Sequence, residues 1–437
     1  MRNSLRNFSQ INISVIQHLF KLVWNRKRAN ALIVIELLAA FLVLTGVCTT
    51  IVHFTKVYLQ PLGYDYQGRW NILAYRKDLA GEFSNRTTNG NGGNYDRTSK
   101  AAQFQSAENI LATLKGLPEV ESCGLLSSTP FSFSQSNTNF GRGKQYRTEQ
   151  ISATDGIAKT LNLTMTQGRW FNATDDQYNG TTSTVKPIVV NTVAAELFFG
   201  NENPIGKDIS HLEANGVDKE QLRMRYRVVG VVSDFRRGSE FDQSSSLMFH
   251  RVSLFDTTAW LPSQLLVTMK SSVGAGYEEN LLTTLQQTAP DWEFQISTLE
   301  ADRAKKHRIF KTTTGVGMTI AAFLLLMVAL GLVGVVWQSV MRRMRELGVR
   351  RAFGATRTDV RLFIVGELAA LTTFAVVLGV FMLAQFPLIP FFDIPAATYI
   401  TSILVSVIAL YSLTALCAWY PSRLAGTVQP SEALRYE

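Results

Sequence analysis

Four long apolar runs interrupt an otherwise polar chain of 437 residues. The first run, residues 31–52, contains one charged side chain, Glu36, and the three later runs contain none. A helix needs about 20 mostly apolar residues to cross a membrane, whereas helices buried in globular proteins are shorter and rarely free of charge. We therefore expect four transmembrane helices, at residues 30–53, 312–339, 362–386 and 398–420.

Between the first and second runs lies a polar segment of mixed pattern, residues 54–311. RWNILAYR near its start alternates as a strand does, SAENILATLKGLPEV has helical spacing, and VESCGLLSS is strand-like again. A second strand, helix and strand follow over residues 265–297. The two units flank residues 130–250, so we expect one α+β subdomain with a mostly β subdomain inserted into it.

Two shorter helical patterns lie beside the first two runs. Within residues 1–29, LRNFSQINISVIQHLFKLVWNRKR places its apolar residues on one helical face. This predicts an amphipathic helix at the inner membrane surface, with packing against a partner protein as the open alternative. Residues 299–311, LEADRAKKHRIFK, are typical of a charged helix that leads into the second run.

The net charge of +9 is concentrated in the segments that flank the runs. Residues 1–30, 340–361 and 421–437 together carry +11, whereas residues 54–311 carry about +1. Because Lys and Arg accumulate in cytoplasmic loops, we expect both termini and the 340–361 loop in the cytoplasm and the 54–311 segment outside. Membrane orientation thus explains the basic excess, and we expect no nucleic acid as a partner.

The sequence contains no recognisable catalytic, cofactor-binding or metal-binding pattern. The five histidines are scattered, and neither G-x-S-x-G nor H-E-x-x-H occurs. There is no G-x-x-x-x-G-K-[ST] loop for a nucleotide phosphate, so we expect ATP hydrolysis, if any, in a separate subunit. Cys48 and Cys417 fall in predicted spans and leave Cys123 alone in the outer segment, where no disulfide is expected.

The 340–361 loop has more internal pattern than a charge anchor requires. Gly348 and Gly354 bracket VRRAF, a short helical segment that Gly354 can end by adopting a positive φ. Thr356 and Asp359 have the spacing of a capping box at the start of the third span. We predict a short basic helix held between two membrane helices; a positive loop without a partner is the simpler alternative.

Two acidic residues lie within the predicted spans, Glu36 and Glu367. Acids inside a membrane are functional candidates by default. Both lie near the cytoplasmic ends of their helices, however, and we expect them to pair with a nearby arginine such as Arg361.

Several segments resemble one family. ELGVRRAFGATRTDV followed by FIVGELAALTTFAVVLGV resembles the FtsX-like domain of ABC transporter permeases, in the MacB-type group, and the ending YPSRLAGTVQPSEALRYE is similar to the family's ending. GRWFNATD, IVVNTVAAELFFGNENPIGKDI and YRVVGVVSDFRRGS resemble its periplasmic core domain. The resemblance implies an α-helical membrane protein with four transmembrane helices and a large α+β periplasmic domain inserted between the first and second helices.

The resemblance also implies partners and a location. Members of the family lie in the bacterial inner membrane, pair with a second permease subunit and bind two copies of a cytoplasmic ABC ATPase, here expected on separate chains. The loop after the second span acts as the coupling helix, although Phe353 stands where the family usually has an aliphatic residue. The positions carried over are Glu346, Gly348, Arg350, Arg351, Gly354 and Ala355.

The function expected first is relay of an ATP-driven motion to the periplasmic domain. Efflux through a periplasmic adaptor and a TolC-like outer-membrane channel is the favoured use. Lipoprotein release and control of cell-wall hydrolases are alternatives, although the division protein FtsX has a much smaller outer domain. A membrane sensor or scaffold without transport is a different class, and a membrane enzyme is disfavoured by the absent catalytic pattern.

Overall fold

The computed structural model describes residues 27–77, 97–133, 136–140, 144–178, 185–210, 225–255, 261–271, 273–274, 276–385 and 395–427. They form two compact units: the membrane unit, from the described parts of Met1–Lys56 and Lys311–Glu437, and the inserted domain, Val57–Phe310. Most of the predicted N-terminal amphipathic helix lies outside the described residues, as does the terminal segment QPSEALRYE.

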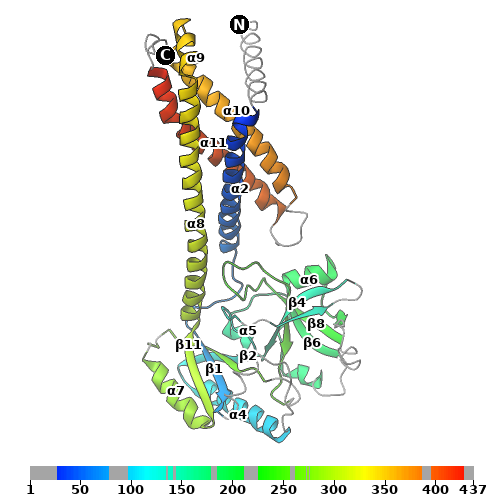
Figure 1. Cartoon of the computed structure of the whole chain (residues 1–437). Helices are drawn as coiled ribbons and strands as arrows, with labels where there is room; N and C mark the ends of the chain where they lie inside the picture. Colours follow the sequence, from blue (N-terminus) through cyan, green and yellow to red (C-terminus); the bar gives the residue numbers. More distant parts are fainter. Residues whose placement is uncertain are drawn as a thin grey trace, which may run out of the picture. The chain divides into compact units, whose positions relative to one another are not determined.

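Four long helices dominate the membrane unit (Figure 1). They are α2 (Lys27–Tyr58), α8 (Leu299–Arg342), α10 (Arg357–Leu383) and α11 (Ala396–Thr427). Each is long and apolar enough to cross a membrane, in agreement with the predicted fold class. α8 continues from Leu299 without a break into the apolar run, so the charged segment 299–311 is helical as predicted.

The four helices pack through a shared apolar cluster. Leu37 and Phe41 of α2 are fully buried, and α10 contributes Leu371 and Ala375. A Cβ on Gly379 of α10 would overlap the Phe41 ring, so this glycine permits the close approach of the two helices. The opposite faces expose large apolar side chains, as contact with lipid requires; among them are Phe323, Leu326, Phe381, Leu404 and Ile408.

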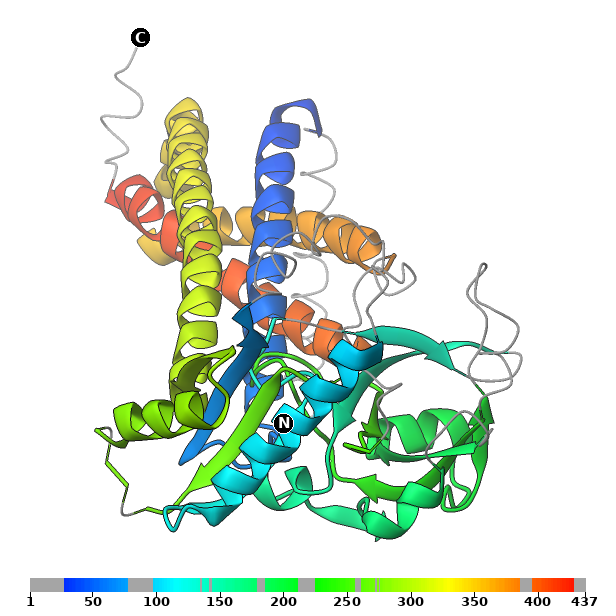
Figure 2. The same ribbon diagram turned by 90° about the horizontal axis from the view of Figure 1, so that it is seen from below.

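The inserted domain is built on one sheet, whose first portion is antiparallel. Its strands lie in the order β11 (Trp292–Thr298), β1 (Arg69–Arg76), β10 (Gln264–Met269) and β2 (Val120–Leu126). Ile72 of β1 is buried in one cluster with Leu114 of α4 (Arg97–Gly116) and Leu285 of α7 (Tyr277–Thr288). α4, cyan in Figure 2, crosses these strands. The strands and helices predicted for this portion are confirmed.

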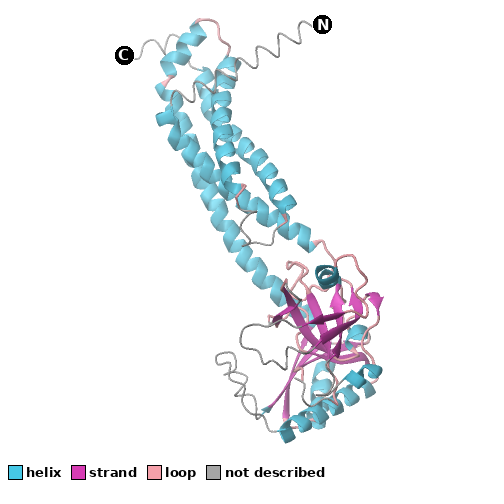
Figure 3. Cartoon of the chain, turned by 90° about the vertical axis from the view of Figure 1, so that its right-hand side faces the viewer, coloured by secondary structure: helices cyan, strands magenta, loops and turns pink. Residues whose placement is uncertain are grey.

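The second portion of the sheet is mostly strand, drawn in magenta in Figure 3 with the rest of the sheet. It continues with β4 (Tyr146–Ala153), β9 (Leu247–Arg251), β6 (Val185–Asn191), β8 (Arg225–Val232) and β5 (Met165–Gly168). β3 (Asn137–Phe140) pairs with β4, and β7 (Asp208–Ser210) pairs with β8. Its helices are short: α5 (Ile157–Thr160), the 3₁₀ helix η2 (Ala173–Tyr178) and α6 (Thr192–Phe199).

The two portions of the sheet meet at a single residue pair, Leu126 of β2 with Ala153 of β4. One buried cluster, with Ile72 and Leu114, lies in the first portion, and a second cluster joins Leu266 of β10 to Ile151 and Phe249 of the second portion. Because the strands of both portions belong to one sheet, the predicted subdomain limits at about residues 130–250 stay a prediction.

Candidate functional site

The predicted cytoplasmic loop contains a short helix, α9 (Met344–Ala352), between α8 and α10. Arg343 departs from helical geometry, with φ −111° and ψ 11°, and separates α9 from α8. Leu347 and Gly348 are buried, and Leu347 belongs to the apolar cluster of the spans. Glu346 and Arg350 are exposed on the other side of the helix. The short basic helix predicted from the sequence is confirmed, with one face fixed against the spans.

Gly354 ends α9 in the predicted conformation. Its φ is +98°, a region that residues with a Cβ enter only at a cost. The Gly354 amide donates to the Arg351 carbonyl at 3.1 Å, and the Ala355 amide donates to the Arg350 carbonyl at 3.1 Å. These two bonds form a Schellman motif, which satisfies carbonyls that otherwise lack a partner at a helix end.

The start of α10 carries the predicted capping box. The Asp359 amide donates to Thr356 Oγ1 at 3.2 Å, and the Thr356 amide donates to Asp359 Oδ2 at 2.9 Å. The Thr356 hydroxyl donates to the same carboxylate at 2.7 Å. Only two residues, Gly354 and Ala355, separate the two caps, so little of the connection between α9 and α10 is left to bend.

Replacing Gly354 by alanine is expected to lower the free energy of unfolding by about 1 kcal/mol, because the new Cβ is strained at a positive φ. The control is Gly334→Ala in α8, where a Cβ meets no atom within 4 Å and φ is helical. There the same substitution should be neutral or stabilise by up to about 1 kcal/mol. Denaturant unfolding of the full chain in detergent measures both; equal effects would contradict the role of Gly354.

Arg350 connects α9 to α10. Its Nη2 lies 3.0 Å from Glu346 Oε1, and its guanidinium carbon lies 4.2 Å from the centre of the Phe363 ring. Both side chains of the ion pair are more than 40% exposed, so the pair contributes only a few tenths of a kcal/mol. The neighbouring Phe353 is 88% exposed, which is unusual for a large apolar side chain outside the apolar runs.

Glu367 forms an ion pair, but its partner is Arg343 rather than the predicted Arg361. Arg343 Nη1 donates to both carboxylate oxygens of Glu367, at 2.8 and 2.7 Å. Arg361 precedes Glu367 by six residues on the same helix and points to another side, because contacts along a helix join residues three or four apart. The pair lines a cavity of about 30 Å³ with Ser339 and Phe363.

Glu36 behaves differently from Glu367. Its carboxylate packs against Gly331 of α8, where a Cβ would overlap it. No Lys or Arg among the residues that the structure describes lies within ion-pair distance, so the prediction of an arginine partner is wrong within this part of the chain. The reason is that residues 312–341, which include the facing segment of α8, contain no charged residue.

The structure also shows a polar cluster that the sequence analysis missed, where the ends of α2 and α8 join the inserted domain. Arg236 is 2% exposed and donates to the carbonyls of Gln60 (2.6 Å), Asp242 (3.0 Å) and Glu240. Its amide donates to the Leu62 carbonyl at 3.0 Å. The segment that follows α2 is thereby fixed to the 236–242 loop.

Glu240 in the same loop binds α8. Its carboxylate, 8% exposed, accepts hydrogen bonds from Arg303 and from His307 Nε2, the latter at 2.7 Å. Burial alone would raise the pKa of Glu240, but the hydrogen bonds from His307 and Arg303 outweigh it and lower this pKa below the ordinary value.

Phe241 completes the cluster by stacking on both helices. Its ring lies 5.5 Å from that of Tyr58 in α2 and 3.7 Å from that of Phe310 in α8, between centroids. We call Arg236, Glu240 and Phe241 the helix clamp. Arg236 belongs to YRVVGVVSDFRRGS, which enters the sequence analysis only through the family resemblance, and Glu240 and Phe241 lie just beyond this segment. Two arginines close to Phe235 and Phe241 are the signal that the sequence contains.

The described residues hold no group of three or more His, Cys, Asp or Glu side chains that a metal ion would require.

Four apolar helices with a mixed domain between the first two define a multi-pass membrane protein. Residues 71–297 match the MacB-like periplasmic core domain, and residues 318–430 match the FtsX-like permease C-terminal domain. The first match alone spans more than half of the chain, and the chain belongs to this family of ABC transporter permeases.

Two bacterial proteins are similar to this chain over most of its length. The macrolide export ATP-binding/permease protein MacB of Bdellovibrio bacteriovorus is 24% identical over 69% of this chain and 47% of its own length. The uncharacterized ABC transporter permease YknZ of Bacillus subtilis is 23% identical over 77% of this chain and 81% of its own length. The chain therefore spans about half of the length of the MacB relative and most of YknZ.

Two solved structures are also similar to this chain. The periplasmic region of MacB from Actinobacillus actinomycetemcomitans aligns with a TM-score of 0.36 at 18% identity, covering 57% of this chain and 96% of that one. The extracellular domain of YknZ aligns with a TM-score of 0.32 at 14% identity, covering 52% of this chain and 99% of that one.

Proposed function

We propose that this permease transmits an ATP-driven conformational change from separate cytoplasmic ABC ATPase subunits to its periplasmic core domain. The observation that carries the proposal is α9, a helix with hydrogen-bonded caps on both sides of its connection to α10 and one buried face. A helix fixed in this way moves the spans when it is moved. The coupling surface consists of Glu346, Gly348, Arg350, Arg351, Gly354 and Ala355, with Phe353 as the exposed anchor.

The helix clamp supports the other end of this relay. α8 is one continuous helix from Leu299 to Arg342, and Glu240 holds its first turns through Arg303 and His307. A displacement of α8 is therefore passed to the 236–242 loop of the core domain. The closed ATPase dimer binds ATP more tightly than the open dimer does. ATP therefore shifts the equilibrium between the two towards the closed dimer.

The complete assembly comprises two ATPase subunits and a second permease, either this chain or a paralogue. We place it in the bacterial inner membrane with both termini in the cytoplasm. Export of a substrate taken from the periplasm or the membrane, through an adaptor and a TolC-like outer-membrane channel, is the favoured use, because several relatives are named for macrolide export. The predicted spans contain only Glu36 and Glu367 as charged residues, which gives little support to a polar path through them.

The direct test is purification of the tagged chain from gently solubilised membranes, with its partners identified by mass spectrometry. We expect an ATPase with a nucleotide-binding loop, and an adaptor if the use is efflux. A lipoprotein carrier or a wall hydrolase found in place of the adaptor would still agree with the relay. The function would then be lipoprotein release or control of the hydrolase rather than efflux. Absence of any ATPase, in a preparation that retains other membrane complexes, would refute the relay.

Replacing Phe353 by alanine is expected to weaken ATPase binding about tenfold or more, because an exposed aromatic side chain at the centre of an interface is a typical hot spot. The same change at Phe381, which is also exposed but on the lipid-facing side of α10, should leave binding unchanged. The readout is ATP hydrolysis by the partner as a function of permease concentration, in proteoliposomes with equal amounts of inserted permease. Similar curves for the two variants would rule out Phe353 as the anchor.

A further inference from the structure

The periplasmic core domain contains a cavity of about 230 Å³ where the two portions of its sheet meet. Its lining comes from α4 and β2, from residues 154–156 after β4, from the start of η2, and from the end of β9 with the residues that follow it. Much of the lining is apolar: Leu111, Cys123, Val252, Leu254 and Phe255. An engineered cavity of about 150 Å³ in another protein binds benzene, so this cavity has room for a ring or for the end of an alkyl chain.

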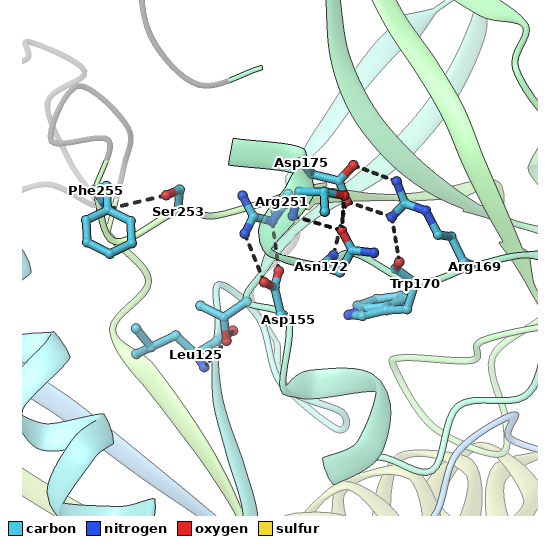
Figure 4. A network of polar contacts seen from close by, with 11 residues as sticks. Leu125, Asp155, Arg169, Trp170, Asn172, Asp175, Arg251, Ser253 and Phe255 are labelled. Carbon is cyan, nitrogen blue, oxygen red and sulfur yellow. Dashed lines mark hydrogen bonds and ion pairs between the residues drawn. The ribbon is translucent and has the colours of Figure 1, made fainter. Parts of the chain in front are cut away.

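One side of the cavity is formed by an ion pair with fixed geometry. Arg251 donates from Nε to Asp155 Oδ1 at 2.8 Å and from Nη2 to Oδ2 at 2.9 Å (Figure 4). The Arg251 side chain is 6% exposed, whereas that of Asp155 is 38% exposed. Such a two-point contact orients both groups and leaves the pair without net charge.

A second ion pair lies behind the first. Arg169 donates to both oxygens of Asp175, at 2.8 and 2.7 Å, and Figure 4 shows Arg251 between this pair and Asp155. Burial alone would raise the pKa of Asp175, but hydrogen bonds from Arg169 and from the Asn172 amide outweigh it and lower this pKa. Asp175 is therefore ionised at neutral pH, and the charges on this side of the cavity remain balanced.

Lys115, Ser253 and Thr154 are further polar side chains of the lining, and Thr154 Oγ1 already accepts from the Leu125 amide at 2.9 Å. Lys115 at the end of α4 forms no hydrogen bond or ion pair with any described residue, and it is the third charged residue of the lining besides Arg251 and Asp155. Ser253 is 5% exposed, and its hydroxyl accepts from the Phe255 amide at 3.3 Å. Its own proton is donated to no described group. Phe255 is 78% exposed and so presents its ring to a bound molecule.

We propose that this cavity binds a small amphiphile with one anionic group. Lys115 and Ser253 receive the anion, a carboxylate or a phosphate monoester, and Leu111, Leu254 and Phe255 contact the apolar body. A cationic amphiphile is disfavoured because the Asp155 carboxylate is already neutralised by Arg251 and Lys115 repels the ligand. The inference goes beyond the proposed relay and is independent of it, since binding needs no ATPase.

The test uses the full chain in lipid nanodiscs of zwitterionic lipid, with Ala173→Cys as an exposed reporter on the cavity lining. Its alkylation by N-ethylmaleimide is followed by peptide mass spectrometry in the presence of decanoate, decyl phosphate, decyltrimethylammonium or decanol. We expect decanoate or decyl phosphate to slow the reaction. Comparison of these two compounds identifies whether a carboxylate or a phosphate head group is preferred. The wild-type Cys123 on the same lining is 3% exposed, and burial raises its pKa to about 11, so its slow alkylation gives the background of the assay.

Lys115→Glu should weaken protection by the anions about tenfold, the effect of removing one charge-assisted hydrogen bond. Lys270→Glu, at an exposed lysine outside the cavity, should have no effect and serves as the matched control. Lys115→Ala removes the charge without reversing it and serves as a second variant in case Lys115→Glu disturbs folding. It should also weaken protection by the anions. Equal protection by all four compounds, no protection by either anion, or equal effects of the two glutamate variants would each overturn the proposal.

Discussion

Replacing Glu367 by alanine is expected to destabilise the membrane unit by about 3 kcal/mol, because it leaves the Arg343 guanidinium partly buried without its acceptor. The two side chains are 19% and 15% exposed and are joined by two hydrogen bonds, so little solvent is available to replace the lost partner. The loss is measured as the free energy of unfolding in mixed micelles of detergent and denaturing surfactant.

The double variant Arg343→Met with Glu367→Leu distinguishes the cost of an unpaired charge from the contribution of the pair itself. Removing both charges eliminates the unpaired group, so we expect the double variant to recover most of the stability lost by Glu367→Ala. Arg350→Ala, which breaks the exposed pair with Glu346, should cost less than about 1 kcal/mol and is the control. Strictly additive losses at Arg343 and Glu367 would show that the two side chains do not stabilise each other.

Replacing Glu240 by glutamine is expected to uncouple ATP hydrolysis from transport and to destabilise the core domain by about 2–3 kcal/mol. Glutamine keeps the shape of the side chain but not the charge that Arg303 requires. Transport per ATP hydrolysed, measured in proteoliposomes with the partner ATPase, should fall while the rate of hydrolysis is retained. Glu202→Gln breaks an exposed pair with Lys207 in the same domain and should change neither quantity.

The pH dependence of stability provides a second readout for Glu240. Its folded-state pKa is lower than the ordinary value of 4.5, because hydrogen bonds from His307 and Arg303 outweigh the effect of burial. The carboxylate therefore stabilises the fold above pH 4.5, and this contribution is lost as the pH falls through the lowered folded-state pKa. The Glu240→Gln variant should lack this part of the acid transition; an unchanged profile would contradict the clamp.

Local patterns made much of the fold predictable. The four spans follow from uncharged runs long enough to cross a bilayer, and the membrane leaves few alternatives to a helix for such runs. Gly354 and the Thr356–Asp359 pair were predictable for another reason: a helix end is decided by residues within one turn of it. The strands and helices of the first portion of the inserted domain were equally visible in their periodicity.

Contacts between distant segments were not predictable from these patterns. Arg343 lies between α8 and α9, and Glu367 lies in α10, so only the packing of these helices shows that they meet. Arg236 lies 176 residues beyond Gln60 in the sequence, and no periodicity connects them. The cavity of the core domain is likewise formed by five segments that are distant in the sequence and whose proximity depends on the sheet order, so no local pattern predicts its lining.

The single pair that joins Leu126 to Ala153 makes the sheet of the core domain mechanically uneven. Two backbone hydrogen bonds cross this seam, from the Ser127 amide to the Ser152 carbonyl at 2.9 Å and from the Thr154 amide to the Leu125 carbonyl at 3.0 Å, whereas most neighbouring strands of the sheet pair over four or more residues. We therefore expect the amides beside this seam to exchange with solvent faster than those at the centre of either portion.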